Sequence, residues 1–298
     1  MRVPINGRTR LAGVIGMPLG HTLSPAMHNA VYEHVGLDWV YIPLAVEDEA
    51  DLRRVLPAIR ALPFVGFNVT MPFKQAMLEL CDEVAMLAQM AGAVNTVHCI
   101  DGHLVGYNTD GRGLTDSLAE ETGFSPEGAN IAILGAGGAA GAAGIGFILG
   151  KASRVTIANR SVERAEELAG RLRPHARATE IVAVGLVEAE DAVREAQLVV
   201  NATPLGMEAD DPSPVHSAWL RPEHIVCDMI YRASDTSLLQ SARSIGATAV
   251  SGLGMLVHQG ALAIDIWNES TQSRVPRDVM RAAAEHAMRT SHVSEVPE

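Results

Sequence analysis

The chain has 298 residues, with 23 basic against 35 acidic side chains, a formal net charge of −12 and 4% aromatic residues. Such a chain lacks the basic surface and stacking platforms that nucleic-acid binding requires, so we expect no nucleic-acid partner. The length allows one large domain or two ordinary ones. Cys81, Cys99 and Cys227 form no CxxC pair, which favours a reduced, cytoplasmic setting, and no cysteine or histidine spacing indicates a metal site.

The first 110 residues alternate between strand-like and helix-like stretches. Ser24 is placed to cap the first helix, with Pro25 in its first turn. Pro57 lies inside the second helical period, where it removes one backbone hydrogen bond. Asp101 and Gly102 predict a hairpin turn. By periodicity we expect strands at 11–16, 39–46, 64–70, 93–100 and 103–107, and helices at 24–35, 48–61 and 73–80.

A second unit begins near Asn130. Strands that alternate with helices predict a parallel sheet covered on both faces. The tail has two helical stretches and no strand after them, so we expect it to fold back onto the first unit. The expected strands are 131–134, 154–158, 181–184, 198–201, 225–229 and 248–251, and the expected helices are 137–149, 162–172, 255–268 and 276–288.

The stretch from Ile131 to Gly150 imitates a membrane span, because it has 20 residues and no charge. Seven of these residues are glycine and six are alanine, and the large apolar residues lie at the two ends. A spanning helix normally has large apolar side chains along its length. We therefore expect a strand, a glycine turn and a small-residue helix, and no membrane partner.

The glycine turn has the spacing of a dinucleotide site. Gly135 and Gly137 keep the G-x-G pattern, while the third conventional position is Ala140. Small residues between a strand and a helix let backbone amides approach a pyrophosphate, although a tight turn under close helix packing would have the same sequence. The candidate cofactor residues of the turn are Gly135, Ala136, Gly137, Gly138 and Ala139.

The end of the next strand bears on which nucleotide binds. An acidic residue there would accept hydrogen bonds from the ribose of NAD, but this chain has Asn159, Arg160 and Ser161, with Arg164 one turn later. Arginine can fork onto a 2′-phosphate, which favours NADP. Two alternatives remain: Arg164 pairs with an acid of its own helix, and Glu163, the nearest acid, leaves NAD open.

Three polar segments indicate a substrate site. Asn68, Thr70 and Lys74 follow one strand, and Asn95 and Asp110 lie in two further loops around the same sheet, where open α/β proteins bind ligands. This set suits a polyhydroxylated substrate. Lys74 could protonate a carbonyl as hydride arrives, since a lysine, unlike an arginine, can lose its proton, and Asp110 would orient it. The structural alternatives are a surface lysine at a helix start and an aspartate N-cap.

Motifs along nearly the whole chain resemble those of the shikimate dehydrogenase family, which includes shikimate/quinate dehydrogenases. The matching segments, in family order, are Gly13–Gly16, His21–Asn29, Asn68–Lys74, Gly92–Thr96, Asn108–Gly111, Gly135–Ala139, Asn159–Ser161, Asn201–Met207, Asp228–Tyr231 and Gly252–Gly260.

The resemblance implies two α/β domains, a substrate domain (1–110 plus 255–298) with a mostly parallel sheet and a Rossmann-type NADP domain (111–254). It implies reversible NADP-dependent reduction of 3-dehydroshikimate to shikimate, in chorismate and aromatic amino acid biosynthesis, with Lys74 as acid/base and Asp110 as its partner. It also implies three sets of binding residues. Ring hydroxyls would be bound by Asn68, Asn95, Asp110 and Gln259, and the carboxylate by Thr22, Ser24, Thr70 and Tyr231. The nicotinamide and ribose would be lined by the Asn201–Leu205 loop, which includes Thr203, Pro204 and Leu205, and by Met229 and Gly252.

Two positions depart from the family pattern. Thr22 stands where serine is usual, and Arg232-Ala233 stands where asparagine-proline is usual. The first could alter tolerance for quinate, and the second the shape of a loop. An NAD-dependent quinate/shikimate dehydrogenase therefore remains an alternative, as does a non-catalytic regulator that binds the same ligands, since fold does not fix function. The sequence leaves a homodimer open.

Overall fold

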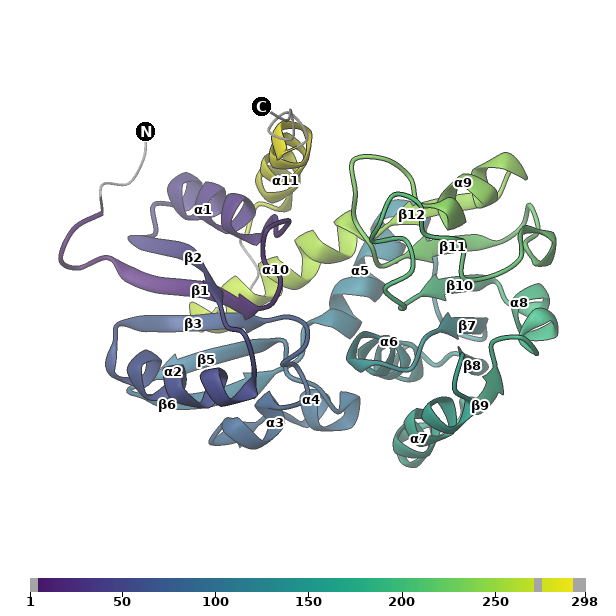
Figure 1. Ribbon diagram of the computed structural model, residues 1–298, viewed down its shortest axis with the longest axis horizontal. Helices are drawn as coiled ribbons and strands as arrows, with labels where there is room; N and C mark the ends of the chain where they lie inside the picture. Colours follow the sequence, from purple (N-terminus) through teal and green to yellow (C-terminus); the bar gives the residue numbers. More distant parts are fainter. Residues whose placement is uncertain (1–4, 271–274, 292–298) are drawn as a thin grey trace. The chain divides into compact units, whose positions relative to one another are not determined.

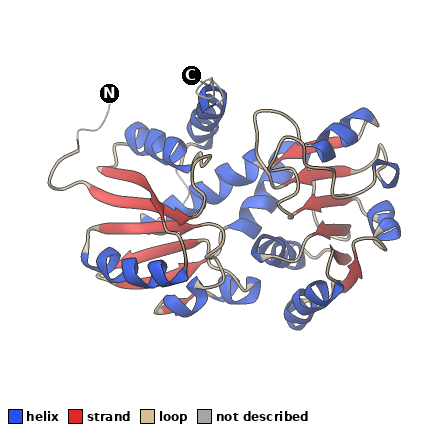
Figure 2. Ribbon diagram, in the orientation of Figure 1, coloured by secondary structure: helices blue, strands red, loops and turns tan. Residues whose placement is uncertain are grey.

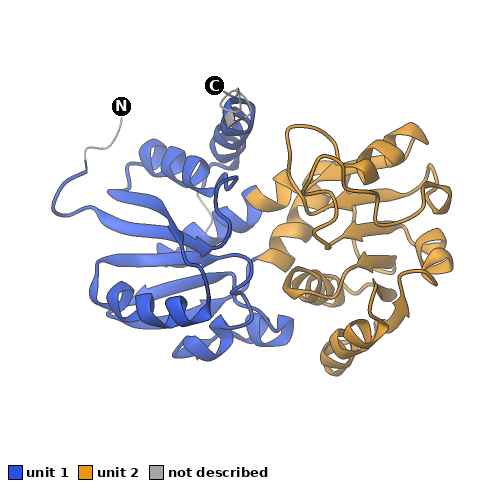
Figure 3. Cartoon of the chain, in the orientation of Figure 1, with its two compact units in different colours: residues 1–109, 257–298 blue, residues 110–256 orange. Residues whose placement is uncertain are grey.

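The structure is a computed structural model that describes residues 5–270 and 275–291 (Figure 1). The chain divides into two compact units: unit 1 comprises residues 1–109 with 257–298, and unit 2 comprises residues 110–256 (Figure 3). Each unit combines a β-sheet with helices (Figure 2).

Unit 1 contains a mixed six-stranded sheet with the order β2-β1-β3-β5-β6-β4. β1 pairs in parallel with both β2 and β3, β5 runs antiparallel to β3 and to β6, and β4 is parallel to β6. Three of the five pairings are therefore parallel. The strands are β1 (Arg10–Gly16), β2 (Trp39–Ala45), β3 (Phe64–Val69), β4 (Glu83–Val84), β5 (Thr96–Ile100) and β6 (His103–Tyr107).

The helices of unit 1 come from both ends of the chain. α11 packs against α1, as Figure 1 shows, and the indole Nε1 of Trp267 at the end of α10 donates to the Val97 carbonyl of β5 at 2.9 Å. The expected return of the C-terminal helices to the first unit is confirmed. These helices are α1 (Ser24–Val35), α2 (Glu49–Ala61), α3 (Met77–Leu80), α4 (Met86–Ala91), α10 (Leu253–Trp267, which begins in unit 2) and α11 (Arg277–Ser291).

The start of α1 differs from the expected cap. The N-cap position is Leu23, which has a helical backbone, and no side chain caps the helix; Ser24 is the first helical residue. The hydroxyl of Thr22 instead accepts the N–H of Ser24 at 3.4 Å. The cap expectation at Ser24 was wrong because the chain already enters the helical region one residue earlier. Pro57 is accommodated inside α2.

The helix expected at 73–80 is only one turn long, Met77–Leu80, and Lys74 lies in the turns that precede it. The carbonyl of Lys74 accepts the N–H of Val94 at 2.8 Å, and Leu78 bonds to a carbonyl only three residues back. A helix from residue 73 would need the Lys74 carbonyl for Leu78. A tertiary hydrogen bond therefore displaces the start of the helix.

Unit 2 contains an all-parallel six-stranded sheet with the order β12-β11-β10-β7-β8-β9. The strands are β7 (Asn130–Leu134), β8 (Arg154–Asn159), β9 (Glu180–Gly185), β10 (Leu198–Asn201), β11 (Ile225–Asp228) and β12 (Thr248–Ser251). The helices are α5 (Asp110–Thr122), α6 (Gly138–Leu149), α7 (Val162–Leu172), α8 (Glu190–Glu195) and α9 (Ser237–Ser244). This is the parallel, doubly covered sheet that the alternation of strands and helices predicts.

Glycines let α5 and α6 approach each other closely. A Cβ at Gly111 would lie 2.3 Å from the Ala142 carbonyl oxygen, and one at Gly146 would lie 2.7 Å from the Gly111 oxygen. Such distances exclude any side chain, so the small-residue composition of α6 serves packing between helices. Within the residues that the structure describes, no helix combines the length and apolar character needed to cross a bilayer.

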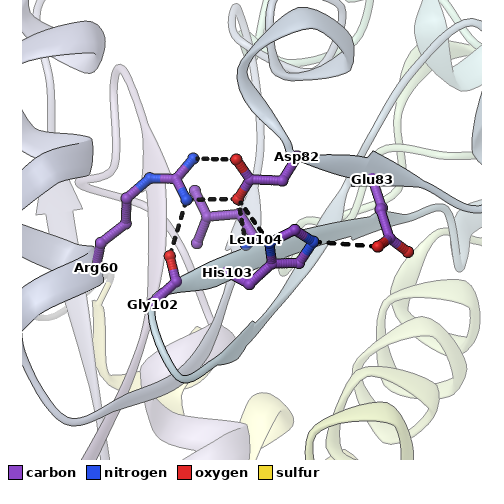
Figure 4. Close-up of polar contacts among 6 residues, drawn as sticks. All are labelled: Arg60, Asp82, Glu83, Gly102, His103 and Leu104. Atoms are coloured by element: carbon purple, nitrogen blue, oxygen red, sulfur yellow. Dashed lines mark hydrogen bonds and ion pairs between the residues drawn. The ribbon is translucent and has the colours of Figure 1, made fainter.

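An ion-pair cluster fixes the tip of the β5–β6 hairpin (Figure 4). The guanidinium of Arg60, near the end of α2, pairs with both oxygens of Asp82 and donates to the Gly102 carbonyl at 2.8 Å. Asp82 also accepts the N–H of Leu104 at 2.8 Å, and His103 lies between Asp82 and Glu83. The cluster therefore links α2, the start of β4 and the hairpin.

Candidate functional site

The polar segments of unit 1 meet at one edge of its sheet. β1 and β3 run in parallel and end at Gly16 and Val69, which places Thr70 just beyond that edge. Because β5 is antiparallel to β3, its first residue, Thr96, pairs with Asn68, and Asn95 directly precedes it. The topology thus brings the end of one strand and the beginning of another to the same edge.

A buried hydrogen-bonded network joins these residues. The amide of Asn68 donates to the Thr96 hydroxyl at 3.1 Å, and the Thr96 hydroxyl donates to the Asn95 amide oxygen at 3.0 Å. The Asn95 amide nitrogen donates to the Thr109 hydroxyl at 2.9 Å and to the Gln259 amide oxygen at 3.4 Å. All five side chains are at most 8% exposed. Asn68, Asn95 and Gln259, three of the residues expected at the substrate site, therefore belong to one group.

Residues that the sequence did not single out complete this network. Tyr41 on β2 donates its hydroxyl to the Asn68 amide oxygen at 2.8 Å, Thr96 bridges Asn68 to Asn95, and Thr109 accepts from Asn95. A weak signal was available, because Thr96 and Thr109 adjoin the candidate residues Asn95 and Asp110. No local pattern indicated Tyr41, which lies 27 residues before its partner.

Thr22, Ser24 and Thr70 are the hydroxyl residues expected to bind a carboxylate. The Thr70 N–H donates to the Ile15 carbonyl at 2.9 Å. A Cβ at Gly16 would lie 2.2 Å from the Thr70 methyl carbon, so β1 ends directly against Thr70. Thr22 and Ser24 follow the same end of β1 and are joined through the Thr22 hydroxyl. The three hydroxyls are therefore carried by segments that leave adjacent strand ends.

Lys74 and Asp110 lie in different units. Lys74 is half-buried in a turn of unit 1, which its carbonyl bond to Val94 fixes in place. Asp110 is the first residue of α5 in unit 2 and is 3% exposed. It directly follows Thr109, whose N–H donates to the Asn95 amide oxygen at 2.8 Å. Within unit 1, then, the position of residue 109 is fixed by the substrate-site network.

The glycine turn of unit 2 has the geometry that a cofactor cradle needs. Gly135 has φ +111°, and a Cβ there would lie 2.9 Å from the Ala202 carbonyl oxygen. Gly137 is the N-cap of α6 and has no side chain, so the cap residue leaves the first amides of the helix uncapped. Ala136 is buried, and Gly138 and Ala139 open the helix. The residues present therefore fit a pyrophosphate at a helix N-terminus.

Two arginines that have no acidic partner among the described residues follow β8, Arg160 directly after the strand and Arg164 in the first turn of α7. Among the described residues, neither Arg160 nor Arg164 forms an ion pair, and both are exposed. The two acids that could pair with Arg164 have other partners. Glu163 accepts the Ser161 hydroxyl at 2.7 Å, and Glu167 pairs with Arg171. The alternative in which Arg164 pairs with its own helix was wrong. Two free guanidinium groups beside a glycine turn fit a 2′-phosphate.

The polar side chain of Asn201 orders the loop after β10. Its amide nitrogen donates to the Leu205 carbonyl at 2.9 Å and to Asp228 at 3.0 Å, and its amide oxygen accepts the Thr203 hydroxyl at 2.7 Å. Burial raises the pKa of Asp228, which also accepts the Thr236 hydroxyl at 2.7 Å. The methyl carbon of Thr203 lies 3.2 Å from a Cβ built at Gly135, so this loop adjoins the glycine turn.

The remaining expected cofactor residues in unit 2 also lie together. A Cβ at Gly252 would meet the Met229 carbonyl oxygen at 2.2 Å, so Met229 and Gly252 are in direct contact. Burial raises the pKa of Tyr231, two residues later. Arg232 donates to the carbonyls of Gly206 and Glu208 at 3.0 and 2.7 Å. The departure at Arg232 therefore has a structural role: it ties down the loop that contains Pro204 and Leu205.

Together, the units define a class of protein: a parallel dinucleotide-type unit joined to a second α/β unit whose buried site is lined by neutral polar side chains. Comparison with known families agrees. Residues 14–97 match the family described as shikimate dehydrogenase substrate binding domain, residues 117–208 match shikimate/quinate 5-dehydrogenase, and residues 252–285 match the shikimate 5′-dehydrogenase C-terminal domain.

Individual proteins give the same assignment. A shikimate dehydrogenase (NADP⁺) of Methanopyrus kandleri is 44% identical over 94% of this chain and 97% of its own length. A solved shikimate dehydrogenase in complex with NADP⁺ has a TM-score of 0.87 at 38% identity, covering 96% of this chain and 98% of its own. A quinate dehydrogenase of Corynebacterium glutamicum in complex with NAD has a TM-score of 0.83 at 31% identity, covering 92% and 98%. The chain belongs to the shikimate dehydrogenase family.

Proposed function

We propose that this protein catalyses the reversible NADP-dependent reduction of 3-dehydroshikimate to shikimate. The observation that carries the proposal is the buried network of Asn68, Asn95 and Gln259, which offers neutral polar groups suited to a ring with several hydroxyls. The similarity over almost the full length to a relative named shikimate dehydrogenase (NADP⁺) supports the same activity. The pathway served would be chorismate and aromatic amino acid biosynthesis.

The substrate is held at two ends. We assign the ring hydroxyls to Asn68, Asn95, Asp110 and Gln259, and the carboxylate to the hydroxyls of Thr22, Ser24, Thr70 and Tyr231. Neutral donors suit a carboxylate in an acidic protein, since they bind it without adding a buried charge that must be paired. Thr22 keeps the hydroxyl of the usual serine and adds a methyl group to the site.

Lys74 supplies the proton at the reacting carbon. NADPH, when bound, supplies the hydride that reduces the C3 carbonyl. The ammonium of Lys74 donates its proton to the carbonyl oxygen as negative charge develops there, and in the reverse direction its neutral amine takes the proton of the C3 hydroxyl. The carboxylate of Asp110 orients that ammonium and holds a substrate hydroxyl.

The cofactor assignment rests on charge and shape in unit 2. The pyrophosphate would lie against Gly135, Ala136, Gly137, Gly138 and Ala139, where backbone amides can approach it. Arg160 and Arg164 would receive the 2′-phosphate, with Asn159 and Ser161 beside them, because both guanidinium groups lack an acidic partner among the described residues. Thr203, Pro204, Leu205, Met229 and Gly252 would line the ribose and nicotinamide.

The nearest rival is an NAD-dependent quinate dehydrogenase, which the similarity to the Corynebacterium glutamicum enzyme keeps open. Steady-state rates with NADP⁺ and NAD⁺, each with shikimate and with quinate, decide between the two. We expect the largest kcat/KM with NADP⁺ and shikimate. A preference for NAD⁺ with quinate would reject the proposal, and measurable shikimate binding without turnover would indicate a regulator.

A further inference from the structure

The side-chain amide of Asn68 has an orientation that its neighbours impose. Its nitrogen lies 3.2 Å from the Asn95 carbonyl oxygen and 3.1 Å from the Thr96 hydroxyl, and its oxygen lies 2.8 Å from the Tyr41 hydroxyl. A backbone carbonyl can only accept, so the amide atom facing Asn95 must be the nitrogen. The amide oxygen of Asn68 therefore faces Tyr41, and the Tyr41 hydroxyl must donate to it.

This arrangement uses both amide hydrogens of Asn68. One goes to the Asn95 carbonyl and the other to the Thr96 hydroxyl. The oxygen has two acceptor sites, and Tyr41 occupies one of them. What Asn68 retains for a ligand is the second acceptor site, so a ligand that contacts this side chain must donate a hydrogen to it.

The next residues of the network keep the same polarity. Since Thr96 accepts from Asn68, its own hydroxyl hydrogen is directed to the Asn95 amide oxygen at 3.0 Å. That oxygen also accepts the backbone N–H of Thr109 at 2.8 Å, a group that can only donate. Two backbone groups, one acceptor and one donor, therefore set the direction of the Asn68–Thr96 and Thr96–Asn95 hydrogen bonds.

Tyr41 is held firmly enough to act as a fixed donor. It is 2% exposed, and its ring stacks on that of His28 with centroids 4.1 Å apart and planes 20° apart. The Asn29 side chain accepts the Tyr41 N–H at 2.8 Å and donates to the Tyr41 carbonyl at 2.9 Å. Both the backbone and the ring of Tyr41 are thus fixed by the adjacent pair His28-Asn29 on α1.

We propose that Asn68, oriented by the Asn95 carbonyl and held in place by Tyr41 as a positioning residue, presents only a hydrogen-bond acceptor to the ligand. The site would therefore select substrates carrying a hydroxyl, rather than a keto, ether or fluoro group, at the ring position next to Asn68. The proposal rests on the proposed function, because it assumes that Asn68 contacts a ring hydroxyl of shikimate. It extends that function by naming the residues that determine which chemical group is accepted at one ring position.

The first test is Tyr41→Phe, which removes the donor and keeps the ring on His28. We expect KM for shikimate to rise about fivefold, while kcat changes less than about twofold, because a lost positioning bond affects substrate binding and leaves the Lys74 proton step intact. The matched control is Tyr32→Phe, which removes a buried hydroxyl that contacts His28 at 3.3 Å in the same aromatic cluster. The control should leave KM unchanged at a similar melting temperature.

The second test reads the polarity directly. Shikimate analogues that carry hydrogen or fluorine in place of one non-reacting ring hydroxyl are measured as competitive inhibitors, since fluorine cannot donate. At the position next to Asn68, the fluoro analogue should bind no better than the deoxy analogue. The Tyr41→Phe variant should bind either analogue nearly as well as wild type does, because neither analogue donates a hydrogen to Asn68. In Thr96→Val, which releases one Asn68 N–H, the fluoro analogue should bind better than the deoxy analogue.

The outcomes separate two failures. A wild-type enzyme that does not oxidise shikimate with NADP⁺ would overturn the proposed function and this inference with it. An active wild type whose KM is unchanged by Tyr41→Phe, or raised equally by Tyr32→Phe, would overturn the inference alone. If Tyr41→Phe does not fold, the Thr96→Val comparison decides, and a fluoro analogue that binds wild type as well as shikimate does would reject the acceptor-only assignment.

Discussion

The candidate sites of the two units are built from different materials. In unit 1 the centre of the site is a network of buried side chains that hydrogen-bond to one another and to the backbone, from Tyr41 through Asn68 and Asn95 to Gln259. In unit 2 the turn at Gly135 presents backbone amides to a ligand. Arg160 and Arg164 are exposed and have no acidic partners among the described residues.

The contrast indicates how each unit achieves selectivity. A buried network fixes the polarity of the groups that it orients toward a ligand, and a ligand of the wrong polarity leaves a buried polar atom unpaired, which is costly. An exposed pair of arginines acts through charge, which water and salt weaken. We therefore expect substrate choice to be strict and insensitive to salt, and cofactor choice to be graded and sensitive to salt.

The largest effect should come from the one ionisable group of unit 1 that the reaction needs. Lys74→Ala should lower kcat by about 10³-fold or more, because no other proton donor replaces the ammonium, while shikimate still binds by equilibrium dialysis. Lys151→Ala is the matched control, since Lys151 is exposed and pairs only with Glu127 among the described residues. Near-normal turnover of Lys74→Ala would contradict the assigned role.

The second effect tests whether the cofactor cradle depends on backbone shape. Gly135→Val places a branched side chain at φ +111° and within 2.9 Å of the Ala202 carbonyl oxygen. The turn must move, so we expect the dissociation constant of NADPH to rise at least about tenfold, measured by fluorescence titration, with shikimate binding retained. Gly170→Ala on α7, where the added carbon meets nothing within 4 Å, is the control and should bind NADPH normally. Normal NADPH binding by Gly135→Val would show that the cradle tolerates a side chain.

The two units also differ in how much of their structure the sequence could predict. In unit 2 the elements and the glycine turn follow local rules: a short apolar strand, a turn of small residues and a helix, repeated in a parallel order. In unit 1 the candidate residues Asn68 and Asn95 could be found at strand ends. Their hydrogen-bond partners could not, because these depend on β5 running antiparallel to β3, which local periodicity does not reveal.

Lys74 shows the same limit at one residue. Its apolar neighbours have helical spacing, so the sequence predicts a helix from residue 73. The structure instead gives the Lys74 carbonyl to Val94, 20 residues later in the chain, and the helix begins only at Met77. A bond of this kind depends on the tertiary fold, and it places the candidate proton donor in a turn.

The third effect tests the graded, electrostatic part of the contrast. Replacing both Arg160 and Arg164 by alanine should raise KM for NADP⁺ about tenfold at low salt and leave KM for NAD⁺ nearly unchanged, since only NADP⁺ carries the 2′-phosphate. Raising the salt concentration should weaken NADP⁺ binding to wild type. The difference in KM for NADP⁺ between wild type and the double variant should therefore become smaller. Arg171→Ala, which breaks a pair with Glu167 on the same helix, is the control. An equal rise in KM for NADP⁺ and NAD⁺ would show that the arginines stabilise the fold and do not recognise the 2′-phosphate.

The smallest effect should come from the exposed ion-pair cluster around Asp82, which lies in unit 1 outside the buried network. This cluster should affect stability slightly and substrate binding not at all. The bonds from Arg60 and from the Leu104 N–H lower the pKa of Asp82 to about 2 (Figure 4). Because this pKa lies below the unfolded value, the stabilisation is present above about pH 4 and is lost as the pH falls toward 2. Side chains that are about one-third exposed are screened by water, so Asp82→Asn should cost less than about 1 kcal/mol at pH 7.

Urea unfolding of wild type and Asp82→Asn at pH 7, 4 and 3 measures the difference in their free energies of unfolding. This difference should become clearly smaller only at pH 3. Glu83→Gln is the control, since Glu83 contacts only His103 in the cluster. KM for shikimate should stay at the wild-type value in both variants. If Asp82→Asn raised that KM as much as Tyr41→Phe does, the effect of Tyr41 would reflect general loosening of unit 1, and the distinction between a polarity-setting network and its surrounding fold would fail.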